Sequence, residues 1–194
     1  MTPKERHDAL AHRKEQGYPW HSPPHLDFGP GAYHVSAACF EHRPVIGQSS
    51  ERMQRFEAEL FHLFVQNDTK VNAWCILPNH YHVLLETESI RGIVQRIGQH
   101  HGRTSFDWNN EENARGRKVW FRCSNRAIRS ERHFWATMNY VHNNAVHHGY
   151  VERWEDWPFS SADAFLRSVG REEAKRIWQE YPPLDYGKGW DETV

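Results

Sequence analysis

Two segments of strand character, residues 71–77 and 80–86, are separated only by Pro78-Asn79. Both segments are rich in apolar and β-branched side chains, and the Pro-Asn pair between them is typical of a turn. A connection this short makes the two strands run side by side in opposite directions. The sequence therefore predicts an antiparallel hairpin, and the remaining elements must be arranged around it.

Helix and strand patterns flank this hairpin in a regular order. A first strand is predicted over Tyr33–Phe40, and Ser49 or Ser50 can cap a helix that ends near Asn67-Asp68. After the hairpin, Ser89 caps a second helix that carries Ile90, Ile93, Val94 and Ile97 at helical spacing. The later predictions are a loop over 107–118, a fourth strand over Lys118–Cys123, a long helix over Ser130–His148 closed by Gly149, and short helices over 159–168 and 171–180.

The order strand, helix, hairpin, helix, strand, helix is typical of an α+β sandwich. We expect an antiparallel sheet with helices packed on it, with a ferredoxin-like central topology. The chain divides into an N-terminal leader (1–27), one domain (28–165) and a C-terminal helical tail (166–194). Three prolines within residues 18–24 prevent regular structure in the leader.

Composition excludes several classes of protein. No segment of the 194 residues approaches the roughly 18 apolar residues that a membrane helix needs, and the polar N-terminus is not a secretory signal. The three cysteines are odd in number and far apart, which argues against a disulfide framework. We therefore expect a soluble, cytoplasmic protein with no membrane partner.

His80 and His82 form the first candidate site. Side chains of a strand alternate between its faces, so these two histidines point the same way while Tyr81, Val83 and Leu85 can enter the core. Two imidazoles on a rigid strand can bind a divalent ion. The same pattern also fits two polar residues on a solvated face, so the pair needs further ligands before it indicates a metal site.

Tyr140 and Asn144 lie one turn apart on the predicted helix over 130–148. Phe134, Met138, Val141 and Ala145 share one stripe of that helix, the expected core face, and Tyr140 and Asn144 lie off it. An exposed tyrosine explains this position equally well. With the amide at i+4, however, Tyr140 is a candidate nucleophile and Asn144 a candidate third metal ligand.

A cluster of basic residues precedes that helix. Seven basic residues lie between 115 and 132, with one acidic residue, Glu131, in the same range. Such a cluster is typical of a phosphate-binding surface, although a solvated basic loop would show the same composition. The candidate DNA-binding residues are Arg115, Arg117, Lys118, Arg122, Arg126, Arg129 and Arg132.

Three motifs together resemble a known family. Residues 77–85, LPNHYHVLL, resemble the histidine–hydrophobic–histidine (HUH) motif of single-strand DNA transposases, and residues 140–144, YVHNN, look like their single-tyrosine helix. Residues 156–161, DWPFSS, are similar to a segment of one subgroup, the REP-associated tyrosine transposases. The resemblance spans about residues 31–162, and it departs from many relatives where Ala145 stands in place of proline.

The resemblance implies the HUH-endonuclease sandwich and a metal-dependent transposase or endonuclease that cleaves and rejoins single-stranded DNA. By position, His80, His82 and Asn144 would hold Mg²⁺ or Mn²⁺, and Tyr140 would form a 5′-phosphotyrosine intermediate. The partner would be DNA with hairpin-forming repeats, met in the nucleoid, and the protein would be a monomer or homodimer. His133, His142 and His148 are candidates to accept the Tyr140 proton.

Other functions remain as alternatives. A domesticated protein that grips DNA hairpins without cutting would share the fold but would not need the His–His–Tyr–Asn set. Histidine-triad hydrolases need a third alternating histidine, where this chain has Leu84. An RNA-recognition domain would share the sheet, but its central-strand aromatic signature is missing from this sequence.

Overall fold

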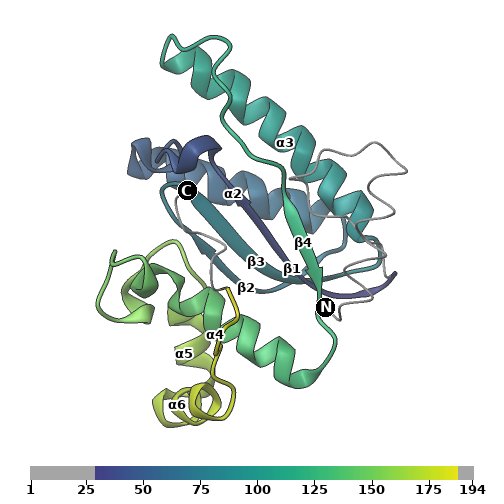
Figure 1. Ribbon diagram of the computed structural model, residues 1–194, viewed down its shortest axis with the longest axis vertical. Coiled ribbons are helices and arrows are strands. Elements are labelled where there is room, and N and C mark those ends of the chain that lie inside the picture. Colours follow the sequence, from purple (N-terminus) through teal and green to yellow (C-terminus); the bar gives the residue numbers. More distant parts are fainter. Residues whose placement is uncertain (1–28, 188–194) are drawn as a thin grey trace.

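A four-stranded sheet forms the centre of the computed structural model, which describes residues 29–187 (Figure 1). Its strands are β1 (Gly31–Ala38), β2 (Lys70–Ile76), β3 (His80–Thr87) and β4 (Ser124–Ala127). The strand order is β2-β3-β1-β4 and every neighbouring pair is antiparallel. This order, with one helix between β1 and β2 and another between β3 and β4, is the ferredoxin-like arrangement. The predicted hairpin and fold class are therefore confirmed.

The helices α2 (Ser50–Gln66) and α3 (Ile90–Glu111) cover one face of the sheet (Figure 1). Phe56, Leu60 and Ile97 from these helices join Tyr33 and Val83 from the strands in one buried cluster. Each helix begins at a serine, as predicted. The Ser49 hydroxyl accepts a hydrogen bond from the Arg52 amide at 3.1 Å, and the Ser89 hydroxyl accepts one from the Gly92 amide at 3.2 Å.

The opposite face carries α4 (Glu131–His147), with α5 (Ala162–Val169) and α6 (Arg171–Glu180) packed beside it (Figure 1). Val141 and Ala145 of α4 share a buried cluster with Ala73, Cys75 and Leu84 of the sheet. The even-numbered residues of β3 therefore face α4, while the odd-numbered ones face α2 and α3.

Residues 159–161 cover the outer edge of β2. The Ile76 amide donates to the Phe159 carbonyl at 2.8 Å, and the Ser161 amide donates to the Trp74 carbonyl at 3.0 Å. Just before this segment, the Trp157 indole donates to the Ile76 carbonyl at 2.8 Å. An uncovered edge strand offers unpaired backbone groups to other chains, so these contacts protect the sheet. The remaining elements are short 3₁₀ turns: η1 (Phe40–His42), η2 (Ile46–Gln48) and η3 (Trp154–Asp156).

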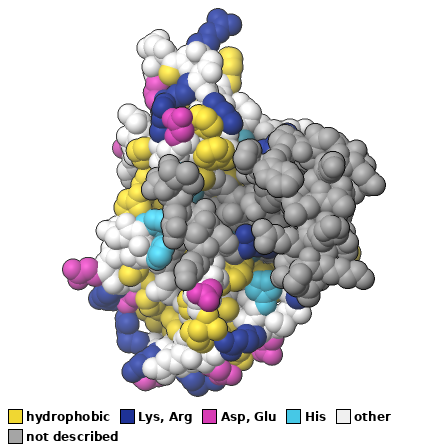
Figure 2. Space-filling model, in the orientation of Figure 1, with side chains coloured by type: hydrophobic (Ala, Val, Ile, Leu, Met, Phe, Trp, Pro, Cys, Tyr) yellow, Lys and Arg dark blue, Asp and Glu magenta, His cyan; other side chains and the backbone are white. Residues whose placement is uncertain are grey.

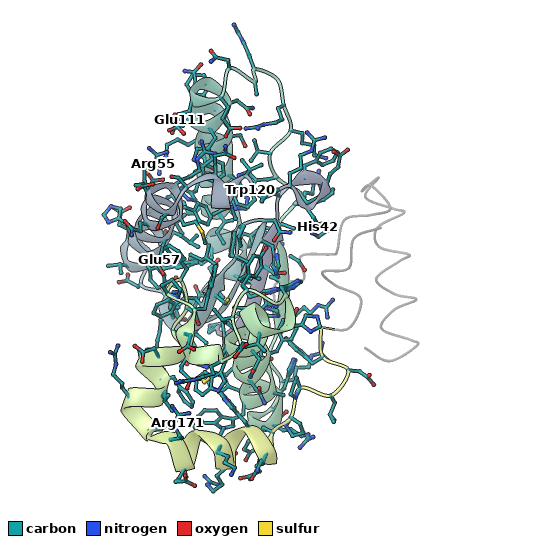
Figure 3. The ribbon with its side chains drawn as sticks, turned by 90° about the vertical axis from the view of Figure 1, so that its left-hand side faces the viewer. His42, Arg55, Glu57, Glu111, Trp120 and Arg171 are labelled. Carbon is teal, nitrogen blue, oxygen red and sulfur yellow. The ribbon has the colours of Figure 1, made fainter. Side chains whose placement is uncertain are left out.

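Several predicted boundaries were wrong: the first strand is Gly31–Ala38 rather than Tyr33–Phe40, and the helix predicted over 159–168 begins at Ala162. Two further differences are larger. Residues 107–111 continue α3 rather than forming a loop, because Trp108 is buried in the core and Glu111 pairs with Arg55 of α2 at 2.7 Å (Figure 3). The fourth strand is Ser124–Ala127, not Lys118–Cys123. Residues 124–127 show no alternation of apolar side chains, and they form a strand because they pair with β1. Residues 118–123 form only an isolated bridge, between Trp120 and Cys39.

The predicted leader, residues 1–27, lies outside the described residues. The predicted boundary at 165/166 falls within α5. Within residues 29–187, no helix combines the length and the apolar character needed to cross a membrane.

Gly47 packs directly against Pro78 in the turn before β3, and substitution of Gly47 tests how much this contact contributes to stability. A β-carbon at Gly47 would lie 2.3 Å from the Pro78 β-carbon and 2.8 Å from its α-carbon, so Gly47→Ala must displace the Pro78-Asn79 turn. We expect a loss of about 1–3 kcal/mol in the free energy of unfolding, the usual cost of overpacking, measured by urea denaturation. The control Gly98→Ala, at an exposed position of α3 with open space around it, should instead gain about 0.5–1 kcal/mol. Equal effects of the two substitutions would contradict this view of the turn.

Candidate active site

His80 and His82 lie at the start of β3, on the face that α4 covers. The side chains are 2% and 1% exposed, and their ring centroids are 5.2 Å apart. The neighbouring Tyr81 and Val83 enter the core on the other face, as the alternation predicted. The two histidines therefore share one face, and that face is buried rather than solvated.

The tautomer of His80 is set by its neighbour. The Asn79 amide nitrogen donates to the His42 carbonyl at 3.1 Å, which orients the Asn79 oxygen toward His80. That oxygen lies 2.8 Å from His80 Nδ1 and can only accept, so Nδ1 carries the proton. In the neutral ring, Nε2 then has a lone pair that is available to a metal ion.

Asn144 of α4 lies opposite this lone pair. Its Oδ1 is 3.0 Å from His80 Nε2, and the side chain is fully buried. Two hydrogen-bond acceptors that face each other at this distance suit a cation between them. The same amide turned by 180° would donate Nδ2–H to His80 Nε2 instead, so the side chain fits both a metal-free and a metal-bound site.

Tyr140 lies beside His82, with its ring edge-on and the ring centroids 5.2 Å apart. It is only 8% exposed. The helix side that the sequence placed off the core stripe thus faces the histidines, and Tyr140 is not the exposed tyrosine that the sequence also allowed. Tyr186 and Gly187 cover its ring: a β-carbon at Gly187 would lie 2.1 Å from Tyr140 Cε2.

Two residues of this site were missed at the level of sequence, His34 and Tyr186. His34 Nε2 lies 3.0 Å from His82 Nδ1, and His34 Nδ1 lies 3.0 Å from the Tyr186 hydroxyl. The alternation of buried Tyr33, Val35 and Ala37 on β1 could have placed His34 on the histidine face. Tyr186 is far away in the sequence and gave no local signal.

A cavity of about 250 Å³ opens beside the histidines. His34, His80 and His82 line it, and Arg122 and Arg126 contribute guanidinium groups. Phe121, which is 38% exposed, also lines the cavity and packs against Phe40 and His42. The arrangement joins positive charge and an accessible aromatic ring to the candidate metal ligands.

The other predicted DNA-binding residues lie in different settings. Arg117 has a structural role, since it bonds Asn109 at 2.9 Å and pairs with Glu112 at 2.6 Å. Lys118 sits over the rings of Phe40 and Phe121. Arg115, Arg129 and Arg132 are exposed; Arg115 lies on the loop beyond α3, which Figure 1 shows far from α4. On the part of the face in Figure 2 that the grey atoms leave uncovered, Lys and Arg side chains are most frequent at the upper and lower ends.

The three histidines considered as proton acceptors for Tyr140 are not equivalent. His142 is fully buried among Trp154, Phe165 and Trp178, and its Nε2 lies 2.8 Å from the Ser161 hydroxyl. It therefore belongs to the packing of α4 against α5 and α6. His148 lies nearer the site, with its ring centroid 4.7 Å from that of His80, and the ring of His133 contacts Tyr186.

The donor set fits a divalent cation with free positions. Among residues 29–187 no three His, Cys, Asp or Glu side chains converge as a metal site. An ion bound by His80, His82 and Asn144 would have two imidazoles and one amide oxygen as its protein ligands. Three neutral ligands leave the full double charge of the ion to an anionic substrate. The set contains both imidazole nitrogen and the amide oxygen that hard cations accept.

Comparison with known proteins gives concordant results. A Haemophilus influenzae protein that carries the provisional name REP-associated tyrosine transposase is 32% identical over an alignment of 124 residues, and the match covers 58% of this chain and 68% of that protein. The structure of a REP-associated tyrosine transposase bound to a REP hairpin superposes with a TM-score of 0.59 at 19% identity, covering 78% of this chain and 86% of the other. A transposase-like protein of Deinococcus radiodurans R1 gives a TM-score of only 0.42 at 17% identity, over 63% of this chain and 89% of that one. No family model matches the chain.

The structural role of His142 predicts a pH dependence of stability. Burial lowers the pKa of His142 to about 3. The unfolded chain, with an ordinary pKa of about 6.5, binds a proton that the folded chain excludes, so stability falls as the pH drops from about 6.5 toward 3. Urea denaturation of His142→Gln between pH 6 and 4 should show a slope smaller by about 1.4 kcal/mol per pH unit. His147→Gln, at an exposed position of the same helix, is the control and should retain the full slope.

Proposed function

The chain belongs to the REP-associated tyrosine transposases, and on this basis we propose that it cleaves and rejoins single-stranded DNA through a covalent bond to Tyr140. The observation that carries the proposal is the convergence of four side chains from two distant elements. His80 and His82 come from β3, and Tyr140 and Asn144 come from α4. Such a set on a buried face serves phosphodiester chemistry better than it serves packing.

The cofactor in this proposal is Mg²⁺ or Mn²⁺. His80 Nε2, Asn144 Oδ1 and one nitrogen of His82 would hold it. The ion would act as a Lewis acid on the scissile phosphate and offset the charge that develops there. The protein's contribution is to present these ligands already oriented, through the bond from His80 Nδ1 to Asn79.

Tyr140 supplies the nucleophile. Its phenol oxygen attacks the phosphorus, the bond from phosphorus to the 3′ oxygen breaks, and a 5′-phosphotyrosine and a free 3′-hydroxyl result. The phenol loses its proton and the departing 3′ oxygen gains one, so the step balances without a cofactor that is consumed. Attack by a 3′-hydroxyl on the phosphotyrosine reverses the step and rejoins a strand without ATP.

The cavity next to the histidines gives the DNA a path to the site. Arg122 and Arg126 are exposed at its wall and can contact phosphates, and the exposed ring of Phe121 can stack on an unpaired base. A related structure contains a REP hairpin, and we extend this class of ligand to the present chain: a hairpin with a single-stranded flank.

A covalent adduct is the direct test. The protein is incubated with labelled hairpin oligonucleotides that carry single-stranded flanks, in Mg²⁺ or Mn²⁺, and separated on a denaturing gel. We expect an adduct that needs the metal and that disappears in Tyr140→Phe. The control Tyr150→Phe removes a hydroxyl from an exposed tyrosine just beyond α4 and should leave the adduct unchanged.

Two outcomes would overturn the proposal. An adduct that persists in Tyr140→Phe would show that another residue is the nucleophile. Tight hairpin binding without any adduct, for every flank and both metals, would favour a hairpin-binding protein that does not cut.

The arginines at the cavity are tested by salt dependence. If Arg122 and Arg126 each contact one phosphate, replacing both with Ala should weaken binding of single-stranded DNA and reduce the slope of log K against log salt by about 1.4. The control Arg167→Ala removes an exposed arginine of α5 that pairs with Asp163 and does not line the cavity. Fluorescence anisotropy at several salt concentrations measures both slopes. An unchanged slope in the double variant would mean that DNA follows another path.

A further inference from the structure

Residues 118–122 form a segment that reaches the candidate active site without belonging to a helix or a strand. Phe121 and Arg122 from this segment line the cavity beside the two histidines. The Phe121 amide donates to the Ala38 carbonyl at 2.9 Å, as part of an isolated bridge and not of a strand ladder. Such a segment can open locally at small cost, so its position depends on contacts that its side chains make elsewhere.

Trp120 makes those contacts with α3. Its side chain, labelled in Figure 3, is 8% exposed, and the indole ring stacks on the ring of His101 with centroids 4.0 Å apart and an interplanar angle of 7°. The indole Nε1–H donates to the Thr104 hydroxyl at 3.1 Å, and that hydroxyl donates its own proton to the His101 carbonyl at 3.2 Å. The stack fixes the plane of the indole, and the hydrogen bond fixes its rotation within that plane.

His101 connects this anchor to the strand that carries the candidate metal ligands. Its Nε2 lies 3.1 Å from the hydroxyl of Tyr81, which is the residue between His80 and His82 in β3. One imidazole ring of α3 therefore contacts both the strand of the ligands and the segment that forms the cavity wall.

The polar character of His101 and Thr104 is more than packing requires. The two residues are 6% and 3% exposed, and the rings of Phe56 and Trp108 lie 5.5 and 5.7 Å from the same indole. Aliphatic side chains would fill this core without the cost of burying polar groups. A satisfied polar network adds direction, so this one favours a single placement of Trp120.

We propose that the stack of Trp120 on His101, tied by Thr104, positions the cavity wall for single-stranded DNA. The three are positioning residues, since none of them lines the cavity. They act through Phe121 and Arg122, whose ring and guanidinium are held at a fixed distance from the candidate ligands. The inference rests on the proposed function for the path of the DNA, but not for the anchoring of the segment.

Local opening of the segment can be measured without DNA. Hydrogen exchange of the full-length protein, followed by NMR, reports the Phe121 amide. Thr104→Val keeps the shape of the side chain but leaves the indole N–H without its acceptor. We expect the Phe121 amide to exchange roughly 2-fold to 10-fold faster in this variant, the effect of one hydrogen bond.

Two controls separate anchoring from general stability. Thr104→Ser keeps the hydroxyl and should exchange as the unaltered protein does. Phe64→Leu alters a buried ring two turns beyond Phe56 in α2, so it should lower the urea midpoint of the whole protein and leave the local exchange of the Phe121 amide unchanged.

DNA affinity gives the second measurement. A labelled oligothymidine of about ten nucleotides is titrated by fluorescence anisotropy. Phe121→Ala should bind about 10-fold more weakly, within the range for one lost stack of a base on an aromatic ring. Thr104→Val should bind roughly 2-fold to 10-fold more weakly, in proportion to the opening of the segment, whereas Thr104→Ser and Phe64→Leu should bind normally. In protein that already carries Phe121→Ala and Arg122→Ala, Thr104→Val should have no further effect, because it acts through those two side chains.

The outcomes separate the two proposals. An unchanged exchange rate of the Phe121 amide in Thr104→Val would overturn the anchoring. Losses of affinity that add in the combined variant would overturn its action through Phe121 and Arg122. Unchanged DNA binding in Phe121→Ala and Arg122→Ala, together with the expected exchange rates, would support the anchoring and count against the proposed path of the DNA.

Discussion

The packing of α4 against the second face of the sheet is the contact on which the site depends. Small side chains make it close: Ala73 and Cys75 of β2 share a buried cluster with Ala145 of α4. Bulkier residues at these positions would lift the helix from the strands. Asn144 would then no longer reach His80, and the candidate ligands would remain on separate elements.

The burial of polar groups on this face argues for function over packing. His34, His80, His82 and Asn144 are each no more than 2% exposed, in a layer where apolar side chains would be more stable. Burying a polar group costs free energy unless its hydrogen bonds are made, and the contacts among these residues offset only part of that cost, since Asn144 Nδ2 is buried without a hydrogen-bond partner among the described residues. The opposite face of the same strands packs hydrophobic side chains such as Tyr33, Val83 and Leu85, as an ordinary core does.

Sequence alone predicted the parts of the molecule that local patterns determine. Serines at helix starts, the Pro78-Asn79 turn and the alternation through His80 and His82 are local signals, and they gave the element order and the pairing of the hairpin. The position of β4 was missed because Ser124–Ala127 has no strand pattern of its own and depends on pairing with β1. Tyr186 was missed for a similar reason: its contact with His34 joins residues 152 positions apart, which no local pattern reveals.

His80 and His82 differ in where their hydrogen-bond partners lie: the partner of His80 is the adjacent residue, and a partner of His82 lies on another strand. His80 is oriented by the adjacent Asn79, which is tied to one backbone carbonyl, so its geometry comes with the turn itself. His82 contacts elements far from its own turn, because its Nδ1 lies 3.0 Å from His34 Nε2 of β1 and His34 Nδ1 lies 3.0 Å from the Tyr186 hydroxyl of the C-terminal segment. Tyr186 also lies against the ring of Tyr140. The same side chain therefore covers the proposed nucleophile and contacts the histidine beside His82, so any movement that uncovers Tyr140 by displacing Tyr186 also takes the Tyr186 hydroxyl away from His34.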